Sequence, residues 1–115
     1  MANVDDLSKR GFGQYGSVFT SVAGAITPPT NKVFIAITFL SDTTLDSSGG
    51  LVADTNHNSC EFIGTNVAAH SGATTNSGAG GDAVDVNDTF PKGITIFGRW
   101  TEIDITAGSI IAYIA

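Results

Sequence analysis

The side chains best suited to chemistry lie close together in the middle of the chain: His57, Cys60, Glu61 and His70. All four are residue types that bind zinc. A structural zinc site needs four closely paired ligands, and a catalytic site needs three ligands on rigid elements. One His-x2-Cys spacing with a distant second histidine, in a stretch rich in Asn and Ser, fits neither pattern. We therefore expect no metal site and no cofactor here.

Calcium is the second metal to consider, because acidic side chains flank this stretch. Asp54, Asn56 and Asn58 resemble the start of an EF-hand loop. In that frame Ser59 stands where the loop needs glycine, and Thr65 stands where it needs the closing glutamate. A further group that could share one ion weakly consists of Asp82, Asp85, Asn87 and Asp88. Solvation of these carboxylates in a glycine-rich loop is the expectation, and weak calcium binding stays open.

Residues 11–16, GFGQYG, match the dinucleotide fingerprint G-x-G-x-x-G letter for letter. That motif binds phosphate only between a buried strand and a helix N-terminus. Residues 5–10 are too polar for a buried strand, and the residues from Ser17 onward have a β-like pattern. We therefore expect no nucleotide site.

Other catalytic patterns are equally incomplete. Residues 90–93, FPKG, resemble the P-x-G turn of cupin barrels, but Ile96 occupies the position of the metal-binding histidine in that motif. The chain has two histidines and no G-x-S-x-G motif for nucleophilic catalysis. The sequence favours a protein without enzymatic activity.

Composition limits the class of partner. The 115 residues suit one domain, and 14% charged residues is well below the roughly one quarter of an average soluble domain. The net charge is −6, and every charged residue between Lys32 and Lys92 is acidic, which disfavours nucleic acid. No signal peptide and no apolar run of about 18 to 20 residues is evident. We expect synthesis in a cytoplasm and no membrane association.

Apolar alternation and turn residues predict strands and no helix. Residues 32–40, KVFIAITFL, are apolar on both faces, which predicts a central strand. The other predicted strands are 17–26, 94–100, 101–105 and 109–115. We expect an all-β fold, an antiparallel β-sandwich or jelly-roll-like barrel. An extended N-terminal arm (1–16) would precede a single β domain (17–115), and glycine-rich residues 68–88 would form a long surface loop.

The C-terminal block 90–115, FPKGITIFGRWTEIDITAGSIIAYIA, resembles the C-terminus of small virion proteins of tailed bacteriophages, particularly marine phages. The resemblance implies a small β domain that decorates the particle. Such a capsid decoration, or cement, protein would be made in the host cytoplasm and would bind the major capsid protein on the virion surface. It would do so as a homo-oligomer, and the symmetry positions of a capsid imply a trimer. The alternative is a host-recognition module of a tail or head fibre that binds carbohydrate through residues 68–88.

A protein of this kind needs interface anchors rather than catalytic groups. Aromatic residues and arginine are enriched at interface centres. The candidates of these types are Phe12, Tyr15, Phe97, Arg99, Trp100 and Tyr113. The alternative role for Phe97, Trp100 and Tyr113 is to fill the β core, and for Trp100 we favour that role.

Overall fold

The computed structural model describes residues 14–55, 62–66 and 82–115. Within these ranges the chain forms eight strands and no helix, which confirms the predicted all-β class. All strand pairs are antiparallel, in one hydrogen-bonded sheet of order β1-β8-β3-β7-β4-β6, with β2 and β5 also paired to β7. The strands are β1 (Ser17–Thr20), β2 (Gly24–Ile26), β3 (Phe34–Phe39), β4 (Thr43–Leu45), β5 (Leu51–Ala53), β6 (Thr89–Phe90), β7 (Thr95–Ala107) and β8 (Ile110–Ile114).

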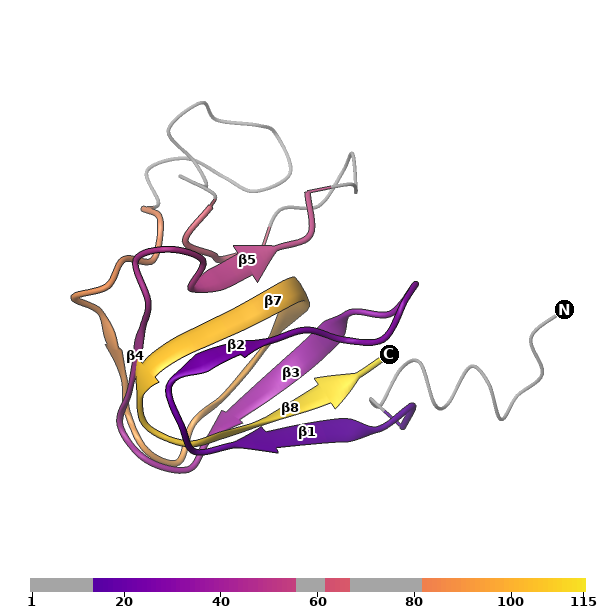
Figure 1. Cartoon of the computed structure of the whole chain (residues 1–115), viewed down its shortest axis with the longest axis horizontal. Helices are drawn as coiled ribbons and strands as arrows, with labels where there is room; N and C mark the ends of the chain where they lie inside the picture. The colour runs from indigo at the N-terminus through magenta and orange to yellow at the C-terminus, as the bar shows by residue number, and fades with distance from the viewer. Residues whose placement is uncertain (1–13, 56–61, 67–81) are drawn as a thin grey trace, which may run out of the picture.

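Strand β7 connects the two halves of the sheet. Its residues 95–100 pair with β3, whereas residues 100–107 pair with β2, β4 and β5. Figure 1 shows β1, β8 and β3 side by side, and β7 continuing from them toward β4 and β5. The inward side chains of both halves belong to one hydrophobic cluster.

The expectation of separate strands at 94–100 and 101–105 is wrong, because β7 runs through both. A register shift opposite Val52 and Ala53 marks a bulge in the ladder next to Trp100. The bulge shifts the alternation by one residue, so that Trp100 and Ile103 are both buried. In the sequence this shift resembles the end of one strand and the start of another.

The predicted first strand, 17–26, is also wrong as a single element. It consists of β1, which pairs with β8, and β2, which pairs with β7. Gly24 has φ +142°, a conformation that favours glycine, and it begins β2. The link between the strands leaves Val22 exposed, at 71%.

Strand β3 is central, as predicted, because it pairs with β7 on one edge and with β8 on the other. A bulge between Phe34 and Ala36 changes the alternation here too. As a result Phe34, Ile37 and Phe39 are all buried in the core. The Phe39 ring stacks on Phe90, with ring centroids 4.7 Å apart.

Segment 62–66 forms hydrogen bonds with the backbone of β5, most of them through the side chains of Thr65 and Asn66. The amide of Asn66 accepts a hydrogen bond from Ala53 N (2.8 Å) and donates one to Ala53 O (3.1 Å). Thr65 N donates to Leu51 O (2.7 Å), and the Thr65 hydroxyl accepts from Leu51 N (3.1 Å). These bonds satisfy backbone groups that a neighbouring strand would otherwise pair.

Deleting residues 110–115 should unfold the protein. Strand β8 lies between β1 and β3 and contributes the buried side chains Ile110, Ala112 and Ile114. Beyond the strand, Ala115 exchanges two backbone hydrogen bonds with Val33. Solubility and circular dichroism of the truncated chain test this expectation, and a soluble truncated chain with a β spectrum would contradict it.

Substituting Gly98→Ala should lower the free energy of unfolding by about 1–3 kcal/mol, the usual cost of overpacking. A Cβ at position 98 would lie 2.7 Å from Cζ2 of the buried Trp100 ring. Because Trp100 is the one tryptophan of the chain, its fluorescence reports denaturant unfolding directly. The control Ser17→Ala, at an exposed strand position, should change stability by less than about 0.5 kcal/mol. Equal stabilities of the two variants would refute the packing argument.

Candidate docking surface

The outward side of strands β1, β8, β3 and β7 forms a surface without charged side chains at its paired positions. One row of register partners joins Phe19, Ile111, Thr38 and Thr95. The next row joins Ser17, Tyr113, Ala36 and Phe97. The alternate residues Ile37, Ile96, Ile110 and Ala112 belong to the core side. We call these outward positions the aromatic face: Ser17, Phe19, Ala36, Thr38, Thr95, Phe97, Ile111 and Tyr113.

Two phenylalanines of the aromatic face are largely open to solvent. Phe97 is 76% exposed and Phe19 is 63% exposed, although both lie in regular strands. Tyr113 and Ile111 are half-buried beside them. The hydroxyls of Thr38 and Thr95 are 2.8 Å apart and hydrogen-bond to each other. Phe19 on β1 and Phe97 on β7 stand at opposite sides of this surface, with β8 and β3 between them. Large exposed apolar groups on one ordered surface are typical of interaction sites.

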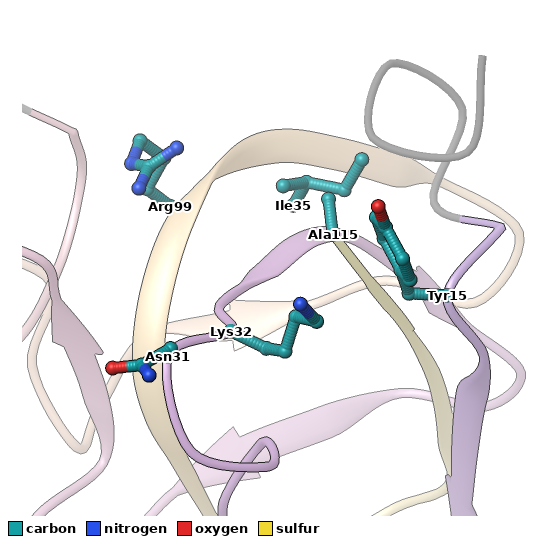
Figure 2. Close-up of a pocket in the computed structure, with 6 residues that line it drawn as sticks. All are labelled: Tyr15, Asn31, Lys32, Ile35, Arg99 and Ala115. Carbon is teal, nitrogen blue, oxygen red and sulfur yellow. The ribbon is translucent and has the colours of Figure 1, made fainter. Parts of the chain in front are cut away.

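A pocket of about 280 Å³ lies at one end of the aromatic face. Its lining includes Arg99 and Ala115, which stand two residues along the chain from Phe97 and Tyr113 of the face, so that alternation places them on the same side of the sheet. Tyr15 joins the lining from the turn before β1. We call this hollow the basic pocket, and Figure 2 shows all six residues that line it: Tyr15, Asn31, Lys32, Ile35, Arg99 and Ala115.

A tight turn positions Lys32 in this pocket. Lys32 N donates to Pro29 O (3.0 Å), and Asn31 adopts a left-handed backbone with φ 64°, which asparagine tolerates better than most residues. The Lys32 ammonium lies 4.4 Å from the centroid of the Tyr15 ring. This cation–π contact holds the charge at a defined place.

Arg99 is fixed by Asp54, which follows β5. Arg99 Nε donates to Asp54 Oδ2 at 3.4 Å, and Asp54 N donates to Arg99 O at 2.8 Å. Asp54 is only 7% exposed, whereas the Arg99 side chain is 35% exposed. The guanidinium has four further N–H donors on its two Nη atoms. Arg99 is therefore anchored at Nε while it borders the pocket.

Carboxylates gather on the outward side of the second half of β7. A Cβ at Gly49 would contact both Glu102 and Asp104, which places the two carboxylates at the Gly49 turn. Burial raises the pKa of Asp104, and the charge of Asp46 raises it further. Hydrogen bonds from Ser48 N and Oγ lower the pKa of Asp46. We call Asp46, Glu102 and Asp104 the acidic patch.

The predicted interface residues divide into three groups. Tyr15, Phe97, Arg99 and Tyr113 lie on the aromatic face or in its basic pocket. Trp100 does not reach this surface, because it is fully buried, with Nε1 donating to Ile63 O at 2.8 Å. Phe12 lies outside the described residues.

Sequence reasoning missed most of this surface, including Phe19, Asn31 and Lys32. Phe19 had a signal, since it alternates with Val18 in a short apolar strand. For Asn31 and Lys32 the sequence offered no signal except the turn expected after Pro28 and Pro29. The residues that line the pocket with them come from other parts of the chain.

The candidate metal ligands are only partly within the described residues. His57, Cys60, Glu61 and His70 lie outside them. The carboxylates of Asp85 and Asp88 accept local backbone hydrogen bonds, from Asn87 N (2.7 Å) and Asp85 N (2.8 Å). In the described part of the chain no three His, Cys, Asp or Glu residues are grouped to hold a metal ion. That part also has no helix long and apolar enough to cross a membrane.

The G-x-G-x-x-G match at residues 11–16 is followed by a strand and not by the helix that the dinucleotide-binding motif needs. Gly16 leads directly into β1, and Gly16 O accepts a hydrogen bond from Ile114 N at 2.8 Å. Gln14 forms a bridge with Ile114. The last three residues of the predicted arm 1–16 therefore lie against β8, while residues 1–13 are outside the described ranges.

The variant Asp104→Asn should be more stable than the wild type at neutral pH. Because folding raises the pKa of Asp104 above its ordinary value of 3.8, the folded state binds this proton more tightly than the unfolded state. The contribution of Asp104 to stability therefore falls as pH rises from 3.8 through the raised pKa. The advantage of the variant should shrink below pH 3.8. Denaturant unfolding at both pH values measures it, and a difference independent of pH would contradict the assignment.

Comparisons with known proteins give no match to this chain among family models, curated proteins or solved structures.

Proposed function

We propose that this chain is a non-enzymatic virion protein of a tailed bacteriophage, of the capsid decoration type. It binds the major capsid protein through the aromatic face and stabilises the shell. The observation that carries this proposal is the exposure of Phe19 and Phe97 on a regular, uncharged sheet surface. Such a surface gains free energy when a partner removes it from water.

A sheet face suits permanent docking. Its side chains are held by strands on both sides of β8 and β3, so little backbone entropy is lost on binding. Aromatic anchors supply most of the binding energy at interfaces, and a stable contact buries roughly 1,200 to 2,000 Å² in total. Two phenylalanines and Tyr113 provide the anchors here.

The distribution of charge supports binding by one side only. The aromatic face is uncharged, while the acidic patch projects from the other half of β7. With a net charge of −6, the chain would keep its acidic surface in water and turn the aromatic face toward the partner. A decoration protein needs this one-sided arrangement.

The sequence resemblance supports the same class. The block 90–115 contains both β7 and β8, which contribute Thr95, Phe97, Ile111 and Tyr113 to the aromatic face. Half of the proposed binding surface therefore comes from the block that resembles phage virion proteins. A homotrimer at capsid symmetry positions, on the virion surface, is part of this proposal.

The competing hypothesis is a carbohydrate-binding module of a tail or head fibre. It assigns the binding site to residues 68–88, of which the structure describes 82–88. No contact among the described residues favours a sugar over water at Asp82, Asp85 or Asp88. Glycan-array binding that disappears with a chelator would support that module instead.

The variants Phe97→Ser and Phe19→Ser test the proposal. Each should weaken binding to phage shells that lack this protein by at least about 30-fold, the usual effect of losing a central aromatic anchor. Since both side chains are exposed in the free protein, the free energy of unfolding should change by less than about 0.5 kcal/mol.

Val22→Ser is the matched control, because Val22 is 71% exposed but lies in the link between β1 and β2. It should bind shells like the wild type. Co-sedimentation with purified shells measures all three variants. Failure of the wild-type chain to bind shells, or equal binding by all variants, would overturn the proposal.

A further inference from the structure

Strand β1 leaves one edge of the sheet open in the part of the chain that the structure describes. It pairs with β8 on one side only, and Figure 1 shows it at the border of the sheet. The edge of β5 is bonded by Thr65 and Asn66, and the other strands with one described partner, β2 and β6, have three and two residues. With four residues, β1 is the longest of these open edges.

The register shows which backbone groups of β1 point away from β8. Gly16 O accepts a hydrogen bond from Ile114 N, so these two residues form a hydrogen-bonded pair of the ladder. Bonded and non-bonded pairs alternate in an antiparallel ladder, so Val18 also bonds to β8, whereas Ser17 and Phe19 do not. The N–H and C=O groups of Ser17 and Phe19 therefore point to the open edge.

This edge has none of the features that usually keep sheet edges apart. Residues 17–20, SVFT, include no charged residue and no proline, and their ladder with β8 has no bulge. Edge strands normally carry such a feature or are covered, because unpaired backbone groups bind other strands. Each chain has a net charge of −6, so an uncharged edge is where two copies can meet without direct repulsion.

Two copies of β1 complement each other in one antiparallel register, with Val18 of each copy at a two-fold axis. Ser17 of one copy then lies opposite Phe19 of the other, and both opposed pairs exchange N–H···O bonds that satisfy the outward groups. The small Ser17 side chain leaves room for the opposed Phe19 ring. On the other side of the sheet the two half-buried Val18 side chains meet, and β-branched pairs of this kind stabilise sheets.

The pairing also accounts for the position of Phe19 at the border of the aromatic face. Opposed side chains of an antiparallel pair lie on the same side of the sheet, so the two copies turn their aromatic faces the same way. Phe19, which is 63% exposed, then lies near the centre of a doubled face, where interface anchors concentrate. Both copies can dock on one surface together.

We propose that two copies of this chain associate through their β1 edges, by antiparallel pairing of Ser17–Thr20 about a two-fold axis at Val18. The pairing relates two copies only, so it differs from the contact within the proposed trimer and joins one trimer to the next. It uses backbone groups of this chain alone and does not depend on the identity of the shell protein.

Disulfide trapping tests the register. In a Cys60→Ser background, Val18→Cys places two thiols at the axis, where opposed Cα atoms about 4.5 Å apart can be bridged. Thr20→Cys is the matched control, since Thr20 is half-buried on the same side of the sheet. Its two copies would lie about four residues apart along the pair, beyond the roughly 7 Å limit for a disulfide. After mild oxidation, non-reducing electrophoresis should show at least about tenfold more dimer for Val18→Cys.

Hydrogen exchange of the wild type provides a test without any substitution. The amides of Ser17 and Phe19 should exchange at least about threefold more slowly in concentrated than in dilute protein, because pairing follows mass action. The amide of Val18, which bonds to β8 in each copy, is the internal reference and should not change with concentration.

The outcomes separate this inference from the proposed function. Equal crosslinking of the two cysteine variants, or exchange at Phe19 that is independent of concentration, would overturn the pairing. If crosslinking of Val18→Cys requires deletion of residues 1–13, the chain's own N-terminal residues occupy the edge and the second copy is wrong. Crosslinking without shell binding supports the pairing while the proposed function fails, and shell binding without crosslinks in solution or on shells refutes the pairing alone.

Discussion

The packing of Trp100 against Gly98 is the interaction on which the rest of the structure depends. Trp100 pairs with Phe34 of β3 and with Ala53 of β5, so it stands where the two halves of the sheet meet. Its ring occupies the space above Gly98, and its indole N–H binds Ile63 O. The bulge beside Trp100 lets β7 serve both halves while Trp100 and the isoleucines after it fill one core.

Strand β7 shows which features of the fold can be predicted from the sequence and which cannot. Alternation identified the central strand β3 and the final strand β8, because their apolar pattern is set by local residue type. It divided β7 in two and joined β1 to β2, because a bulge and the choice of pairing partner are decided by contacts distant in the chain. The alternation of apolar and polar residues along the sequence carries no information about those contacts.

The candidate surface shows a similar division. Residue type alone selected Phe97, Arg99 and Trp100 as anchors. Alternation separates Phe97 from Trp100, but only the pairing of β7 with β3 and β5 shows that the Phe97 side faces water and the Trp100 side faces the core. Lys32 enters the surface through a turn, and its partner Tyr15 precedes β1. No spacing in the sequence could reveal that pair.

Segment 62–66 has a consequence for how this chain can change. Asn66 and Thr65 secure β5 through side-chain hydrogen bonds, and Ile63 O is secured by Trp100, so these five residues act as a local clamp. A neighbouring strand would secure this edge with backbone groups, which almost any sequence supplies, whereas here the pairing depends on the identity of Thr65 and Asn66. Change at these two positions is therefore more restricted than at ordinary loop positions, because a substitution removes the partner of a strand.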